Sequence, residues 1–74
     1  MLIIIHTGTS SDSYLGTIVR RPRCVRAAAA WCDRENGKVR RTNRDAYPVY
    51  EWHDVPADRI DGDRVLSAYD PRSV

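Results

Sequence analysis

The hydrophobic pattern of the chain begins with an unbroken apolar run that predicts a buried strand. Residues 2–6 (Leu-Ile-Ile-Ile-His) are mostly β-branched, and this continuous order is typical of a strand covered on both faces. Turn-forming residues occupy positions 7–13, and β-favouring types return at 14–19. We therefore expect a hairpin of two strands joined by an exposed loop.

After Pro22 the pattern becomes helical. Residues 23–35 are rich in alanine, Pro22 suits the first turn of a helix, and the pair Asn36-Gly37 commonly ends one. One face of such a helix carries small residues and could lie close against a sheet. That predicted face consists of Val25, Ala28, Ala29 and Cys32, with Cys24 and Trp31 at its edge.

Strand patterns return in the second half of the chain. Residues 38–42 and 47–54 read as two strands joined by a polar turn, and the first of them has little to bury, as expected of an edge strand. Residues 56–60 fit a single helical turn or a loop. Residues 65–69 would add a short last strand.

Together these elements predict an α+β fold: a small antiparallel β-sheet of four strands, or five if the last one forms, with one α-helix packed on one face. The expected order is β-β-α-β-β(-β). A chain of 74 residues fits one compact domain, which we place at 1–70, with 71–74 as a disordered C-terminal tail. No apolar run approaches the roughly 18 residues of a membrane span, so we expect neither a membrane segment nor a leader peptide.

The formal net charge of +2 conceals a strong separation of charge along the chain. Residues 20–44 hold nine cations and two acids, a balance of +7. Residues 45–74 hold three cations and seven acids, a balance of −4, and residues 1–19 carry one acid. A basic middle segment is therefore joined to an acidic second half.

The basic segment is densest where the predicted helix begins. Arginines at this end oppose the helix macrodipole, as do Asp33 and Glu35 at the predicted C-terminal end. A helix N-terminus with several guanidinium groups favours phosphate or carboxylate ligands, and Arg40 and Arg41 of the predicted edge strand would extend it into a stripe suited to a nucleic-acid backbone. The alternative is that these arginines pair with the acidic half or are simply solvated. The arginines at the predicted helix start are Arg20, Arg21, Arg23 and Arg26.

The strand predicted at 47–54 interleaves aromatic and acidic residues. Because the chain has no phenylalanine, we expect Tyr50, Trp52 and Trp31 to supply the large core side chains. Tyr14 and Tyr47 are then the better interface candidates. An acidic flank begins in the same strand and could engage a basic groove, although a merely solubilising surface is the alternative. The candidate contact residues of this flank are Glu51, His53 and Asp54.

The two cysteines predict neither a disulfide nor a metal site. Cys24 and Cys32 would lie two helical turns apart, about 12 Å, which is too far for a disulfide. We expect both to be buried, reduced thiols, as in a cytoplasmic protein. No metal-ligand spacing and no cofactor-binding motif is present in the sequence, so we expect no metal and no cofactor.

Three functions remain open from the sequence. Glu51 and His53, with arginines elsewhere, would supply the acid, base and cation of a small toxin-like ribonuclease, but a domain this small rarely forms a dry cleft, so we expect no enzyme. A direct nucleic-acid-binding module is the second possibility. In size and patchiness the chain resembles the small proteins by which bacteriophages redirect host machines, such as anti-CRISPR proteins and RNA polymerase regulators. That resemblance implies a non-enzymatic inhibitor that occupies a surface of a larger host nucleoprotein complex, the function we favour. The sequence leaves the oligomeric state open.

Overall fold

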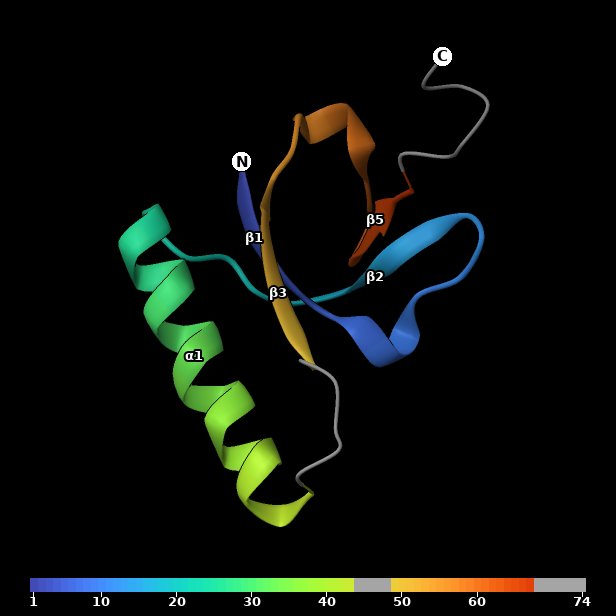
Figure 1. The fold of residues 1–74 in the computed structure, drawn as a ribbon. Helices are drawn as coiled ribbons and strands as arrows, with labels where there is room; N and C mark the ends of the chain where they lie inside the picture. The colour runs from blue at the N-terminus through green and yellow to red at the C-terminus, as the bar shows by residue number, and fades with distance from the viewer. Residues whose placement is uncertain (44–48, 68–74) are drawn as a thin grey trace.

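The computed structural model describes residues 1–43 and 49–67, which form an antiparallel sheet and one α-helix (Figure 1). The five strands lie in the order β3-β1-β2-β5-β4, and every pairing is antiparallel. The predicted α+β fold is thereby confirmed. The elements are β1 (Leu2–His6), a 3-10 turn (Thr7–Thr9), β2 (Tyr14–Arg20), α1 (Val25–Thr42), β3 (Tyr50–Asp54), a second 3-10 turn (Ala57–Arg59), β4 (Ile60–Asp61) and β5 (Arg64–Leu66).

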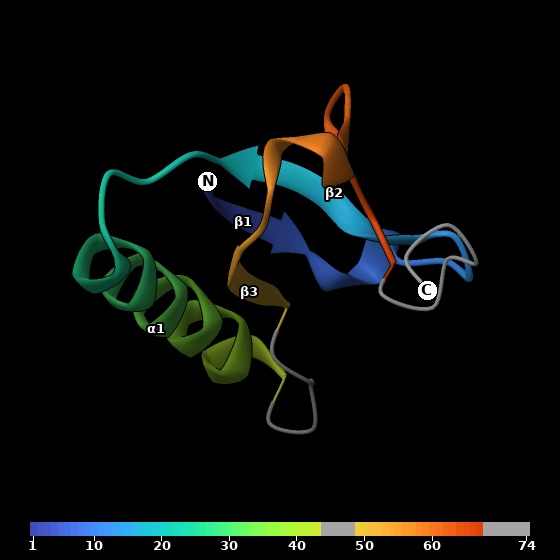
Figure 2. The same ribbon diagram turned by 90° about the horizontal axis from the view of Figure 1, so that it is seen from above.

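The apolar run of β1 is buried on both faces of the sheet, as its sequence predicts. Ile4 points toward α1 and packs with Ala28 and Cys32, whereas Ile3 and Ile5 pack with other apolar side chains on the opposite face. The three isoleucines are 0–1% exposed. Figure 2 shows α1 lying along one side of the sheet, beside β3 and β1. The second face is closed by Val65, Leu15, Ile18, Val55 and Ile60.

The helix continues past the position where the sequence predicts its end. Residues 38–42, predicted to be an edge strand, form the last turns of α1, so that prediction is wrong. Gly37 has no positive φ and does not end the helix. The side chain of Asn36 is buried and bonds to the backbone of β3, and this tertiary contact holds the helix in place where the local signal favours a stop.

The longer helix also corrects the predicted placement of charge. Asp33 and Glu35 lie in its middle, and its last turn carries Arg40 and Arg41, which the macrodipole favours there. No acidic residue lies in the first turn, so the unfavourable charge is confined to the N-terminal end. Lys38 contacts the Glu35 carboxylate at 3.0 Å, and this hydrogen bond is the main reason why the pKa of Glu35 is lowered.

The packing face of α1 differs in part from the predicted one. The buried positions are Ala28, Cys32 and Asn36, spaced four residues apart, whereas Val25 is 47% exposed. Cys24 precedes the helix as its N-cap and is exposed, so only Cys32 fits the expectation of a buried thiol. Both cysteines are free, in agreement with the predicted lack of a disulfide between them.

The aromatic residues contribute less to the core than the sequence predicts. The largest fully buried side chains of the described residues are isoleucines of β1 and Val65. Trp31 and Tyr50 are partly buried against the Ile4 side of the sheet, whereas Trp52 is 37% exposed, so its prediction as a core residue is wrong. Isoleucine dominates the core because consecutive residues of a central strand point to opposite faces of the sheet, so the three isoleucines of β1 are buried on both.

The C-terminal part agrees with the sequence in part. Residues 57–59 form the predicted helical turn, and β5 provides the last strand, over 64–66 rather than from 65 to 69. The short strand β4 at Ile60–Asp61 is not predicted from the sequence. The described residues do not include Tyr47, the predicted tail at 71–74 or most of the turn predicted before residue 47. Among the helices described, none combines the length and apolar character needed to span a bilayer.

Candidate anion-binding site

A pocket lined by arginines lies where β2 passes into α1. Its volume is about 480 Å³, within the range of small-molecule sites. Ile4 of β1 and Trp31 of α1 provide apolar surface. The basic residues that line the pocket are Arg20, Arg21, Arg23 and Arg34.

The local sequence explains why these side chains meet. Ala27, Ala30, Trp31 and Arg34 are spaced as neighbours on one face of a helix, and the two alanines leave space beside the indole. Arg20 pairs with Ile4 across the β1–β2 ladder, and such cross-strand partners share a face of the sheet. The strand end and the helix side thus enclose the pocket from two directions.

Three of the four lining arginines have no carboxylate partner among the described residues. Arg20 lies over the indole of Trp31, with its guanidinium carbon 5.8 Å from the ring centroid. Arg21 donates to the Met1 sulfur at 3.2 Å and to the Gly62 carbonyl at 3.5 Å. Arg34 contacts Glu35 at 3.3 Å. Within residues 1–43 and 49–67, no ion pair joins Arg20, Arg21 or Arg23 to the acidic half of the chain.

This arrangement favours an anionic ligand. Four exposed guanidinium groups converge on one pocket, and no acidic side chain lines it. Like charges held together raise the local positive potential, and guanidinium groups bind phosphate oxygens through paired hydrogen bonds. The pocket is therefore chemically suited to phosphate.

The indole of Trp31 is supported by contact with a second aromatic ring. Tyr50 contacts it edge to face, with ring centroids 4.8 Å apart and an angle of 80°. Tyr50 in turn contacts His6 at 5.5 Å in the same manner. Trp31 therefore packs on the Ile4 side of the sheet with Tyr50 and also lines the pocket beside the arginines.

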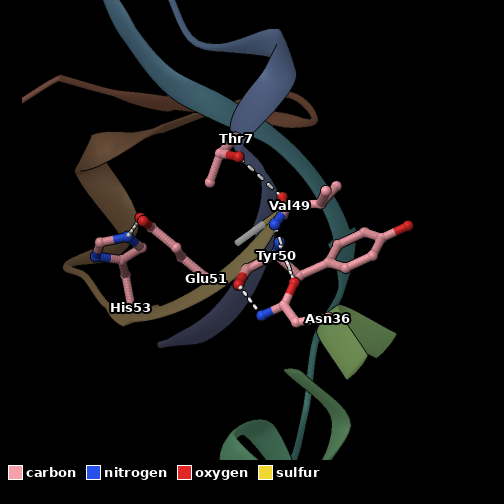
Figure 3. Close-up of polar contacts among 6 residues, drawn as sticks. All are labelled: Thr7, Asn36, Val49, Tyr50, Glu51 and His53. Atoms are coloured by element: carbon pink, nitrogen blue, oxygen red, sulfur yellow. Dashed lines mark hydrogen bonds and ion pairs between the residues drawn. The ribbon is translucent and has the colours of Figure 1, made fainter. Parts of the chain in front are cut away.

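The backbone of β3 is itself positioned by α1 (Figure 3). The Asn36 side-chain oxygen accepts hydrogen bonds at 2.9 Å from the N–H groups of Val49 and Tyr50, and its amide nitrogen donates at 3.0 Å to the Tyr50 carbonyl. On the other side, the Thr7 N–H donates to the Val49 carbonyl at 2.7 Å. The start of β3 is thereby fixed between the helix and the turn after β1.

The remaining predicted basic residues do not join the pocket. Arg26 lies exposed in the first turn of α1 and is not part of the pocket lining. Arg40 and Arg41 lie in the last turn, about 9 Å beyond Arg34 along the helix axis at 1.5 Å per residue, and do not line the pocket. The predicted stripe, which needed these two residues on a neighbouring strand, is therefore not formed.

Tyr14 and the acidic candidates lie elsewhere. The Tyr14 hydroxyl donates to Asp61 at 3.2 Å, and its ring lies beneath the Arg64 guanidinium at 5.2 Å. Asp54 contacts the N-terminal amine at 3.0 Å. The contact candidates of the acidic half thus already have intramolecular partners, and Tyr47 lies outside the described residues.

Glu51 and His53 form a contact of 3.3 Å between Oε2 and Nε2. They pair with Ile5 and Ile3, whose side chains pack on the sheet face away from α1. Figure 3 shows both side chains pointing away from Tyr50 and Asn36. The acid and base are consequently separated by the sheet from the arginine pocket.

Two residues of the pocket, Trp31 and Arg34, are not among the contacts proposed from the sequence. Helical periodicity places Trp31 at the edge of the packing face and Arg34 on the exposed side, so neither indicates a ligand by itself. The useful signal is the spacing of Ala27, Ala30 and Arg34 around the tryptophan, since small residues beside a large ring leave a hollow.

Metal-ligating groups do not gather in the described part of the chain, where no three His, Cys, Asp or Glu side chains come together. Burial raises the pKa of the Cys32 thiol, and the charges of Asp33 and Glu51 add to this effect. Its environment therefore favours the neutral thiol, the less nucleophilic form.

Comparisons with protein-family models, with curated proteins and with solved structures found no match to this chain.

Proposed function

We propose that this chain is a non-enzymatic binding protein that attaches to phosphate groups of nucleic acid within a larger nucleoprotein complex. The observation that carries the proposal is the convergence of Arg20, Arg21 and Arg23 on one pocket without a carboxylate partner among the described residues. Phosphates are the anions that such a complex displays in greatest number, and they bind clustered guanidinium groups favourably.

The ribonuclease alternative draws less support from the geometry. A nuclease needs its acid, base and phosphate-binding cation around one scissile bond. Here Glu51 and His53 lie on the sheet face opposite α1, whereas the lining arginines lie on the helix side. This separation favours binding without catalysis.

The source of the complex is a further part of the proposal. We propose an inhibitor of the phage-encoded type, acting on a host complex as anti-CRISPR proteins or RNA polymerase regulators do. Its support is the short chain together with the separation of charge between a basic middle and an acidic second half. Asp54 and Asp61 have partners within the molecule, which favours the basic pocket as the contact surface.

A salt titration of oligonucleotide binding tests the attachment to phosphate. We expect a labelled oligonucleotide to bind at about 50 mM salt, and log Kd to rise linearly with log salt concentration. Arg21→Ala with Arg23→Ala should lower that slope by about one to two, because each lost phosphate contact contributes roughly 0.7–0.9. Arg40→Ala with Arg41→Ala removes the same charge at the far end of α1 and should change the slope less. Absence of binding at about 50 mM salt would remove the proposal.

The larger complex is tested with the purified protein as bait in a bacterial lysate. Wild-type protein should retain a stoichiometric nucleoprotein complex at low salt, and the Arg21→Ala and Arg23→Ala double variant should lose it. If wild type retains nothing, or if both proteins retain the same material, the arginine pocket is not the contact surface for a complex.

A further inference from the structure

We propose that the pocket takes an unpaired nucleobase between the Arg20 guanidinium and the Trp31 indole, so that the protein prefers single-stranded over double-stranded nucleic acid. This inference rests on the proposed function and names the form of nucleic acid that it recognises. Arg20 already lies over the Trp31 ring, with its guanidinium carbon 5.8 Å from the ring centroid, and both residues line the pocket. Guanidinium groups and aromatic rings both offer flat surfaces on which unpaired bases stack in single-strand recognition.

The spacing requires only a small movement of one exposed side chain. A base stacked between two flat groups needs them about 7 Å apart, because carbon atoms pack at about 3.5 Å, so Arg20 must move outward by at least about 1 Å. Arg20 is exposed and has no carboxylate partner among the described residues, so little opposes this movement. Trp31, by contrast, is held by Tyr50 and by the Ile4 cluster and provides a fixed platform.

The other arginines suit the phosphates on either side of the inserted base. Arg21 and Arg23 come from the segment that joins β2 to α1, and Arg34 comes from the next turns of the helix, so they line the pocket from separate directions. The volume of about 480 Å³ is sufficient for a group of nucleotide size. A duplex keeps its bases stacked and paired, and could offer only its backbone to these arginines.

Fluorescence of Trp31 provides a direct measurement. The variant Trp52→Phe leaves Trp31 as the only tryptophan, and Trp52 is not part of the pocket lining. Three probes are compared in this background: a thymidine oligonucleotide of about eight nucleotides, an abasic strand with the same number of phosphates, and a duplex of the same length. The thymidine strand should quench Trp31 and bind about 5- to 150-fold more tightly than the abasic strand, since stacking on an aromatic side chain strengthens binding by this factor.

Two variants separate stacking from charge. Arg20→Lys keeps the charge but removes the flat guanidinium, and it should abolish most of the difference between the thymidine and abasic strands while leaving the salt slope unchanged. Arg26→Lys makes the same change outside the pocket and should preserve the difference. Trp31→Leu, followed by the anisotropy of a labelled strand, should act like Arg20→Lys.

The outcomes distinguish this inference from the proposed function. Equal binding of all three probes with no quenching of Trp31 overturns the stacking while leaving attachment to phosphate in place. An Arg20→Lys variant that still distinguishes the thymidine strand from the abasic strand also overturns it. Failure of every probe to bind at about 50 mM salt overturns the inference and the proposed function together.

Discussion

Replacing Gly37 with alanine should stabilise the protein, although the sequence alone predicts the opposite. If Asn36-Gly37 ended the helix, Gly37 would adopt the left-handed conformation that alanine disfavours by about 1–2 kcal/mol. In the structure Gly37 lies within α1 and has no positive φ. A Cβ built there meets nothing within 4 Å, so the substitution neither clashes nor fills a space.

The magnitude follows from helix propensity, because packing does not change. Alanine exceeds glycine by about 0.8–1.0 kcal/mol in a helix interior, and Gly37 lies five residues before the helix ends, so we expect a gain of about 0.5–1 kcal/mol. For a chain of this size that corresponds to an increase in Tm of about 2–8 °C. Urea denaturation followed by circular dichroism should show a higher midpoint and an unchanged m-value.

Gly62 offers a matched control. It also has open space around a Cβ, but its φ is +65° in the turn between β4 and β5. Gly62→Ala should therefore destabilise the protein by about 1 kcal/mol, the two glycines differing in backbone conformation rather than in packing. If Gly37→Ala lowers stability as Gly62→Ala does, the helix ends at Gly37 in solution and the assignment of 38–42 to α1 is refuted.

Three further predictions concern Asn36 and the two cysteines. Asn36→Ala removes three hydrogen bonds to Val49 and Tyr50, each with a net value of about 0.5–1.5 kcal/mol, and gains about 0.6 kcal/mol in helix propensity. Urea denaturation should therefore show a free energy of unfolding lower by about 1–4 kcal/mol. A decrease below about 0.5 kcal/mol would contradict this role of Asn36. Exposed Cys24 should react with Ellman's reagent in the native protein and Cys32 only after unfolding, and two equally reactive native thiols would contradict that burial. Burial raises the pKa of Cys32 in the folded state, so the unfolded state loses the thiol proton first as pH rises. The free energy of unfolding should therefore fall above the unfolded thiol pKa of about 8.5. The stability advantage of wild type over Cys32→Ala should shrink in that pH range.

The location of the basic surface could be predicted in part from the sequence. Arg20, Arg21 and Arg23 are close together in the chain, so no fold could separate them widely, and the structure places them on one pocket. The sequence places Arg40 and Arg41 on the same surface only through a predicted strand at 38–42. Because these residues are helical, both arginines lie at the far end of α1. Trp31 and Arg34 line the pocket only because the helix packs against Ile4 beside the end of β2.

The features that follow from the order of residues without the fold are those that depend on neighbours along the chain. Three consecutive isoleucines require cover on both faces of a strand, whatever packs there, and the hairpin from β1 to β2 follows from a polar loop between apolar runs. The separation of charge also follows from the order of residues alone. The buried strand, the hairpin and the separation of charge each depend on residues close together in the chain, so tertiary packing does not change them.

Three other features depend on contacts between residues distant in the chain: the end of α1, the exposure of the aromatic rings and the set of arginines that share a pocket. The pair Asn36-Gly37 disfavours a continuing helix by about 1–2 kcal/mol. Three hydrogen bonds join buried Asn36 to Val49 and Tyr50, and together with the favourable arginines of the last turn they outweigh that preference. Local propensities are small compared with the sum of contacts made by residues distant in the chain. The arginine pocket exists for the same reason, since it joins the end of a strand to the side of a helix that only the folded packing brings together.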